Sequence, residues 1–191
     1  MVAITIDADF SDIRRKLKTL QADVADKATK RALDRTVEQG KAEMTRRIRE
    51  EFNLPAGKVR EKLFVKRASF ARGRLGLEAV LFSRDASGKR RAINLINFQA
   101  RETRQGLSFK VKRSGGRSVI KQGFIGNKGR TAFIREGKKR LPIKALQTID
   151  VPQMFNTRRI NQAVVRKLRD VFPAVFEREL RFYTAKFRGA R

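Results

Sequence analysis

The chain has 191 residues, of which 47 are Lys or Arg and 19 are Asp or Glu, so its formal net charge is +28. It contains no Cys and no His, which excludes disulfides, thiol chemistry, Cys/His zinc sites and imidazole acid–base catalysis. Hydrophobic residues make up 40% of the chain, so we expect a folded core in a single domain over residues 1–191. Because no apolar run reaches the roughly 20 residues of a membrane-spanning helix, and because no basic segment and apolar core open the chain, we expect neither a signal peptide nor a membrane partner.

The N-terminal part, residues 9–53, is predicted to be helical after a short strand at residues 2–6. Apolar residues recur at spacings of three and four in two stretches that are out of phase, which fits either two helices or one long bent helix. Asp9 or Ser11 is the expected N-cap. The helical part ends by Asn53, because Leu54–Pro55 disfavours continuation, and a short third helix is predicted from Pro55 to about Leu63. The two apolar stretches comprise Phe10, Ile13, Leu17, Leu20 and Val24, and then Leu33, Val37, Met44 and Ile48.

The central part, residues 64–150, is predicted to form an antiparallel or mixed sheet of about three to five strands with basic loops. Residues 75–82 read as a strand largely buried on both faces, and residues 107–112 as a half-buried strand with a basic outer face. Ser114-Gly115-Gly116 is predicted to be a hairpin turn. Further strands are expected at residues 118–124, 131–135 and 141–146. The Phe residues of this part are predicted to pack in the core and not to stack on bases; they are Phe64, Phe70, Phe82, Phe98, Phe109, Phe124 and Phe133.

The C-terminal part, residues 156–188, is predicted to be a helix with Asn156 or Thr157 as its cap and with a kink or break at Pro173. The order helix, sheet, helix predicts an α+β fold. The apolar positions of the helical parts are expected to pack either inside the chain or between subunits. The candidates for this packing are Leu33, Val37, Met44, Ile48, Ile160, Val164, Leu168, Phe176 and Leu180.

The positive charge is concentrated in the centre of the chain. Residues 54–144 carry 25 basic and 5 acidic residues, a net charge of +20, whereas residues 1–53 carry +2 and residues 145–191 carry +6. Such a charge predicts a polyanionic partner, most commonly nucleic acid and next a membrane surface. Basic residues on Gly-rich loops suit phosphate contacts without base recognition; the alternative is that these loops are simply solvated. The candidates for contact with DNA are Lys110, Lys112, Arg113, Arg117, Lys128, Arg130, Lys138, Lys139 and Arg140.

No pattern of residues predicts a catalytic or cofactor-binding site. Asp23, Asp26 and Asp34 stand beside several Lys and Arg residues, so they are interpreted as ion pairs. The Gly-rich segments lack the spacing of a P-loop. We therefore expect no enzymatic activity, no cofactor and no metal.

Several motifs, in order along nearly the whole chain, resemble the phage minor tail protein Z family, the tail-completion proteins of long-tailed bacteriophages. The segment at residues 32–37, Ala-Leu-Asp-Arg-Thr-Val, is similar to that family's A-[LI]-N-R-[TV]-[AV] signature. The most specific matches are Arg-Leu-Pro-Ile-Lys at residues 140–144 and Val-Pro-Gln-Met-Phe at residues 151–155. Residues 147–150 depart from the family, since many relatives carry a Gly-Pro-Ser turn there. Weaker matches occur at residues 59–63, 98–103 and 107–112.

This resemblance implies a structural virion protein at the head-proximal end of the tail, made and assembled in the host cytoplasm. It implies a homo-oligomeric ring, expected to be a hexamer, that contacts the tail terminator, the tail tube and the head–tail connector proteins. Double-stranded genomic DNA passes through that joint, so the basic region is expected to face DNA without reading its sequence. The alternative hypothesis is a free-standing, sequence-nonspecific nucleic-acid-binding protein, for example a ribosome-associated or packaging protein.

Overall fold

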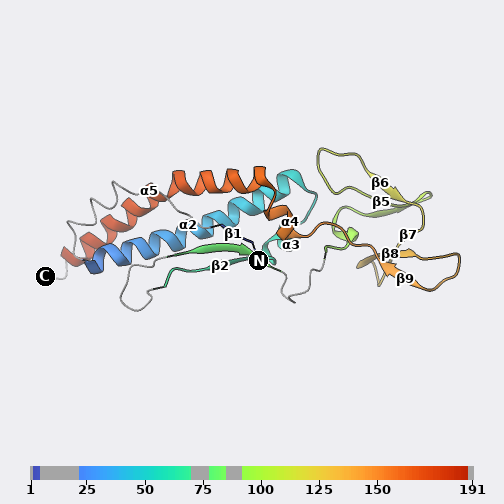
Figure 1. The fold of residues 1–191 in the computed structure, drawn as a ribbon, viewed down its shortest axis with the longest axis horizontal. Coiled ribbons are helices and arrows are strands. Elements are labelled where there is room, and N and C mark those ends of the chain that lie inside the picture. Colours follow the sequence, from blue (N-terminus) through green and yellow to red (C-terminus); the bar gives the residue numbers. More distant parts are fainter. Residues whose placement is uncertain (1, 5–21, 70–77, 85–91, 189–191) are drawn as a thin grey trace. The chain divides into compact units, whose positions relative to one another are not determined.

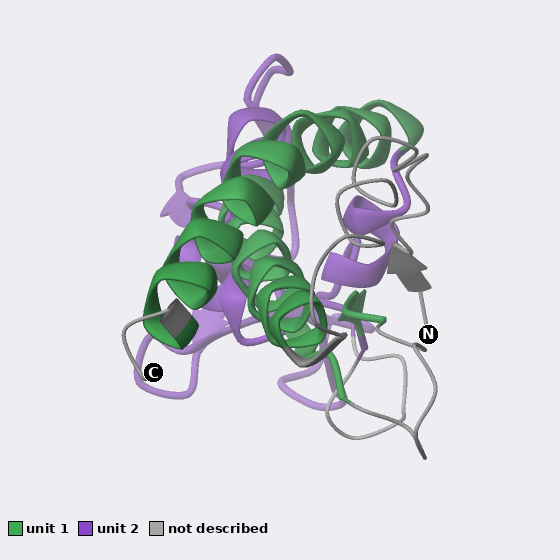
Figure 2. Cartoon of the chain, turned by 90° about the vertical axis from the view of Figure 1, so that its left-hand side faces the viewer, with its two compact units in different colours: residues 1–44, 63–83, 158–191 green, residues 45–62, 84–157 purple. Residues whose placement is uncertain are grey.

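The computed structural model describes residues 2–4, 22–69, 78–84 and 92–188. Its elements fall into two compact units, which Figure 2 shows in green and purple. Unit 1 comprises residues 1–44, 63–83 and 158–191, and unit 2 comprises residues 45–62 and 84–157. Helices and small antiparallel sheets together give the α+β fold that the sequence predicts.

Unit 1 contains most of two long helices and all of one small sheet (Figure 1). The helices are α2, Ala22–Glu51, whose last residues belong to unit 2, and α5, Arg158–Arg188. The strands are β1, Val2–Ile4; β2, Leu63–Lys66; and β3, Val80–Ser83. They form an antiparallel sheet in the order β1-β3-β2.

The long helices α2 and α5 lie side by side and antiparallel (Figures 1 and 2). On α2, Ala28, Ala32, Thr36 and Gly40 recur every four residues and are all buried. A Cβ atom at Gly40 would lie 3.0 Å from both methyl carbons of Leu168. The small residues therefore allow the two helices to approach closely.

Helices α2 and α5 resolve two predictions from the sequence. Within the described residues, the second apolar stretch belongs to one continuous helix that ends at Glu51. Of the first apolar stretch only Val24 is described, and it is buried in the same helix; Phe10, Ile13, Leu17 and Leu20 and the expected caps Asp9 and Ser11 lie outside the described residues. Helix α5 runs through Pro173 without a break, and its ribbon changes direction along its length (Figure 1). Pro173 thus does not split the helix.

The packing candidates lie mostly in the interior. Leu180 is half-buried. The others are buried within this chain: Leu33, Val37, Met44, Ile48, Ile160, Val164, Leu168 and Phe176.

Unit 2 contains six short strands in two three-stranded antiparallel sheets. The sheet β4-β5-β6 comprises Arg101–Thr103, Gly106–Phe109 and Ser118–Ile120. The sheet β7-β8-β9 comprises Gly123–Gly126, Thr131–Arg135 and Ile143–Ala145. The unit also contains the short helices α3, Ala56–Arg60, η1, Leu95–Asn97, and α4, Val151–Phe155. The described strands thus form three small sheets across the chain, where the sequence predicted one.

The single strand predicted at residues 118–124 is two strands in two sheets. Strand β6 ends at Ile120, and β7 begins at Gly123. A Cβ atom at Gly123 would lie only 2.7 Å from the Cβ of Leu107, and one at Gly106 (φ 122°) only 2.3 Å from the Ile120 carbonyl oxygen. Two glycines therefore let the chain turn tightly between the sheets.

The other predicted strands and turns agree in part. The strand predicted at residues 75–82 is observed as Val80–Ser83, and residues 75–77 lie outside the described part. Its residues alternate between buried and half-buried, so neither face is exposed, in agreement with a strand largely buried on both faces. The connection from β5 to β6 spans residues 110–117 and is longer than a hairpin turn. The third helix is confirmed but is shorter than predicted: Pro55 is its N-cap, the helix ends at Arg60, and Leu63 begins strand β2.

The predicted aromatic core is only partly correct. Phe98 is fully buried, while Phe70 lies outside the described residues. Two pairs stack within their own sheets, Phe64 on Phe82 at 5.7 Å and Phe124 on Phe133 at 5.8 Å between ring centroids. The remaining described Phe residues of this part are only half-buried; they are Phe64, Phe82, Phe109, Phe124 and Phe133. Of the helices that the structure describes, none is sufficiently long and apolar to span a membrane.

Candidate nucleic-acid interface

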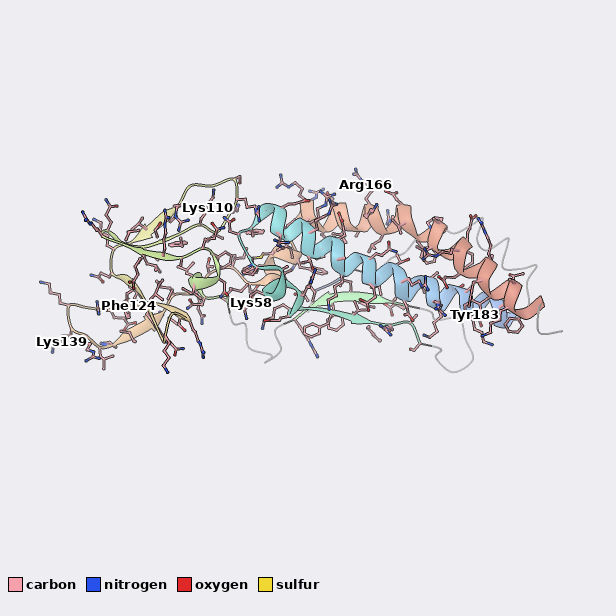
Figure 3. All side chains as sticks on the ribbon, turned by 180° about the vertical axis from the view of Figure 1, so that it is seen from behind. Lys58, Lys110, Phe124, Lys139, Arg166 and Tyr183 are labelled. Atoms are coloured by element: carbon pink, nitrogen blue, oxygen red, sulfur yellow. The ribbon has the colours of Figure 1, made fainter. Side chains whose placement is uncertain are left out.

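The candidate DNA contacts occupy three connections between the strands of unit 2, here called the basic loops. These are residues 110–117 between β5 and β6, residues 127–130 between β7 and β8, and residues 137–140 between β8 and β9. In Figure 3, Lys110 and Lys139 mark the first and third loops. Lys110 is half-buried, and the other eight candidates are exposed.

The first basic loop is fixed at its base by the last residue of α2 and by Asn53, which follows the helix. The Asn53 backbone N–H donates to the Val111 carbonyl at 2.8 Å, and the Arg113 N–H donates to the Glu51 carbonyl at 2.9 Å. The Asn53 side-chain amide also donates to the Lys110 carbonyl at 3.2 Å. Asn53 is only 9% exposed. These bonds hold the backbone of residues 110–113 in one conformation. The side chains of Lys110, Lys112 and Arg113 therefore extend from a fixed backbone.

Arg117 closes the other end of the same loop. Its Nε donates to the Ser108 hydroxyl at 2.9 Å, and its Nη2 donates to the Gln99 carbonyl at 2.6 Å and to the Ser108 carbonyl at 3.2 Å. Most of its donors are therefore engaged within the chain. In this structure Arg117 positions the loop, whereas the sequence suggested only a phosphate contact.

The second basic loop is a tight turn. Asn127 and Lys128 both have φ values of 52°, and Gly129 has a φ of 83°. The Gly129 N–H donates to the Gly126 carbonyl and the Arg130 N–H to the Asn127 carbonyl, each at 3.1 Å. Gly and Asn tolerate this left-handed backbone well. The turn places the side chains of Lys128 and Arg130 on the surface.

The third basic loop joins β8 to β9 and carries Lys138, Lys139 and Arg140 in succession. At its base the Glu136 N–H donates to the Pro142 carbonyl at 3.2 Å. Leu141 beside it is 65% exposed. The three cations therefore stand next to an exposed apolar residue at the end of a short hairpin.

The charge of this region is not balanced internally. Residues 92–150 carry 14 basic and three acidic residues. The Glu102 carboxylate accepts the Ile125 N–H at 2.6 Å, and Asp150 caps α4 by accepting the Gln153 N–H at 2.8 Å. Arg117 is occupied by the hydrogen bonds described above. None of the other eight candidates forms an ion pair within the described part of the chain. These cations are available to an external anion.

The acidic residues do not form a site of their own in the described ranges. No three of them gather closely enough there to hold a metal ion. Asp34, which the sequence assigned to an ion pair, contacts Lys30 at 3.1 Å.

Comparison with protein families gives a match that covers nearly the whole chain. The family described as prophage minor tail protein Z (GPZ) matches residues 11–187. The chain is therefore a phage tail protein with a structural role in the virion tail. It belongs to the prophage minor tail protein Z family, as its motifs indicated. Searches of the curated proteins and of the solved structures gave no significant match.

Proposed function

We propose that this protein is a tail-completion protein at the head-proximal end of the phage tail. In this proposal it forms a ring with the tail terminator and helps to make the head–tail joint through which genomic DNA passes. The observation that most strongly supports this proposal is that eight cations on the basic loops lack a carboxylate partner in the described part of the chain. A ring whose loops face the channel would bring these cations to the phosphate backbone.

The physics of DNA binding suits this arrangement. Cations that neutralise phosphates release condensed counterions, and this contribution does not depend on sequence. A joint that must pass every part of a genome requires such contacts and gains nothing from base recognition. The loops contribute Lys side chains at turns, which offer point charges without a rigid geometry.

The remaining parts of the proposal concern assembly. The ring is proposed to contain six copies and to contact tail tube and head–tail connector proteins as well as the terminator, without cofactor, metal or catalysis. Because the apolar positions of α2 and α5 are mostly buried within the chain, contacts between copies are assigned to other surfaces. Assembly takes place in the host cytoplasm.

A charge-neutralised variant tests the role of the basic loops. The triple variant Lys138→Gln, Lys139→Gln and Arg140→Gln is compared with Arg158→Gln, Arg166→Gln and Lys167→Gln, which removes three exposed cations from α5. Binding to a random-sequence DNA duplex is followed by fluorescence anisotropy at several salt concentrations. Each lost phosphate contact lowers the slope of log affinity against log salt by about 0.9. We expect a clear loss of slope in the loop variant only; equal slopes in both variants would contradict the proposal.

Sedimentation tests the assembly part separately. The protein is mixed with the terminator protein of the same phage, and ring-sized species are expected. A chain that remains monomeric while it binds DNA would instead support the free-standing nucleic-acid-binding protein.

A further inference from the structure

Unit 1 has an open hollow of about 680 Å³ between the first half of α2 and the last part of α5. It lies outside the basic loops, and the proposed function does not use it. The cations in its lining are Lys27, Lys30, Arg31, Arg35, Arg67 and Arg178.

The hollow is organised around one buried carboxylate. The side chain of Glu179 is only 3% exposed. Its carboxylate forms ion pairs with Arg35 Nη1 at 2.9 Å, Arg31 Nε at 3.3 Å and Arg178 Nε at 3.7 Å. A hydrogen bond with the Tyr183 hydroxyl, together with the charge of Glu179, raises the pKa of Arg31. The guanidinium groups are therefore held in place before any ligand arrives.

Positive charge exceeds negative charge at this site. Six cations line the hollow, against the lining acids Asp34 and Glu38 and the buried Glu179. Asp34 already accepts the Ala68 N–H at 2.7 Å and pairs with Lys30, and Glu38 pairs with Arg67 at 3.4 Å. All three carboxylates are therefore engaged, and the cations at this site outnumber them.

Aromatic rings lie beside these cations. The Arg31 guanidinium lies over the Phe182 ring at 5.6 Å, and the Lys27 ammonium lies over the Phe187 ring at 5.1 Å. Phe182 is 51% exposed and Phe187 is 36% exposed. The surface thus offers apolar contact area next to fixed cations, a combination suited to a peptide that carries both carboxylates and apolar side chains.

We propose that this hollow binds an acidic peptide segment of a neighbouring tail protein, with carboxylates on the arginines and an apolar side chain on Phe182 or Phe187. Three features favour a peptide over DNA. The site is concave, its cations are already partly paired, and its rim carries aromatic rings. A DNA duplex, in contrast, binds more readily to exposed cations without ion-pair partners, such as those of the basic loops.

The test uses the full chain and two probes: a fluorescein-labelled peptide of alternating Glu and Leu residues, and a labelled DNA duplex. The hollow variant Lys30→Gln, Arg67→Gln and Arg178→Gln removes three exposed or half-exposed cations and leaves Arg31 and Arg35 on Glu179. The loop variant Lys138→Gln, Lys139→Gln and Arg140→Gln removes the same charge from unit 2. We expect the hollow variant to weaken peptide binding about tenfold more than the loop variant does, equivalent to about 1.4 kcal/mol.

The DNA probe separates this proposal from general attraction to polyanions. We expect the hollow variant to bind DNA as the wild type does. Equal loss of peptide binding in both variants, loss of DNA binding in the hollow variant, or no peptide binding by the wild type would each overturn the proposal. None of these outcomes depends on whether the basic loops bind DNA.

A single substitution covers the case in which the triple hollow variant does not fold, as judged by circular dichroism. Gln39→Glu adds a negative charge to the lining, and Gln162→Glu adds one to an exposed position of α5 outside it. Weaker peptide binding in Gln39→Glu alone supports the site. Equal binding by the two variants overturns it.

Discussion

At the scale of single residues, Glu179 has the most demanding environment among the described acidic residues. Its carboxylate is nearly inaccessible to water and depends on Arg31 and Arg35 of α2 for compensation. Removing the charge of a buried group whose partners are cationic leaves those partners without a counterion. Because both arginines are about half exposed, water solvates their charges and offsets part of this destabilisation.

The variant Glu179→Gln is expected to lower the free energy of unfolding by about 2 kcal/mol, below the range for fully buried pairs. Urea unfolding followed by circular dichroism measures the change. Glu177→Gln on the same helix is the control, since Glu177 is half exposed and pairs with an exposed Arg181, and such pairs contribute little. An unchanged midpoint for Glu179→Gln would show that the buried carboxylate does not stabilise unit 1.

Asn53 is a buried polar residue whose side chain anchors the first basic loop. The variant Asn53→Ala removes side-chain bonds to the Lys110 and Lys112 carbonyls and is expected to cost about 1 kcal/mol. Hydrogen exchange should become faster at residues 110–113, because their backbone loses its anchor. The exposed Asn156→Ala provides the control. Protection that is unchanged at residues 110–113 would exclude Asn53 as the positioning residue of this loop.

The roles of Asn53 and Arg117 were not predictable from the sequence, whereas the basic loops were. Clusters of Lys and Arg beside Gly mark exposed turns by their local composition alone. The anchoring bonds, in contrast, join residues as far apart as Asn53 and Lys110, 57 positions along the chain. Local sequence patterns carry no information about such a long-range pairing. The residue type Asn also does not show whether the side chain is buried or exposed.

At the scale of elements, the close approach of α2 and α5 depends on the small residues of α2. The variant Gly40→Leu is expected to destabilise the protein by about 2 kcal/mol or more, because it forces bulk against Leu168, which is 1% exposed. Gly57→Leu in α3 is the matched control, since nothing lies within 4 Å of a Cβ atom there. Thermal unfolding compares the two. Equal melting temperatures would show that the helices tolerate a wider separation.

The long helices α2 and α5 were predicted well because their apolar spacing extends over many turns, whereas the short helices η1 and α4 were not predicted. The sheets were predicted less well because strands such as Arg101–Thr103 contain only three residues, too few to show an alternation. The separation of β6 from β7 depends on Gly106 and Gly123, and the sequence shows two glycines without showing what they contact. Strands β2 and β4 were missed for the same reason of length.

At the scale of the whole molecule, the sequence predicts one cooperative domain over residues 1–191. Each compact unit is assembled from separate segments of the chain, and the boundary at residues 44 and 45 falls inside α2. We therefore expect a single calorimetric transition whose van't Hoff and calorimetric enthalpies agree. Two resolved transitions would contradict a single cooperative domain.

The charge of the molecule connects its fold to its place in the virion. A net charge of +28 opposes the compact state by self-repulsion and favours association with a polyanion. The basic loops concentrate cations that lack internal partners within the described part of unit 2, while most of the charged residues that line the hollow in unit 1 take part in ion pairs. We infer that the first surface serves DNA and the second serves a protein.

The most direct test of this account is the structure of the assembled phage neck by cryo-electron microscopy. We predict a ring of this protein at the head-proximal end of the tail, with residues 110–117, 127–130 and 137–140 facing the DNA channel. A ring in which these loops face outward, away from the channel, would contradict the proposed role in the passage of DNA.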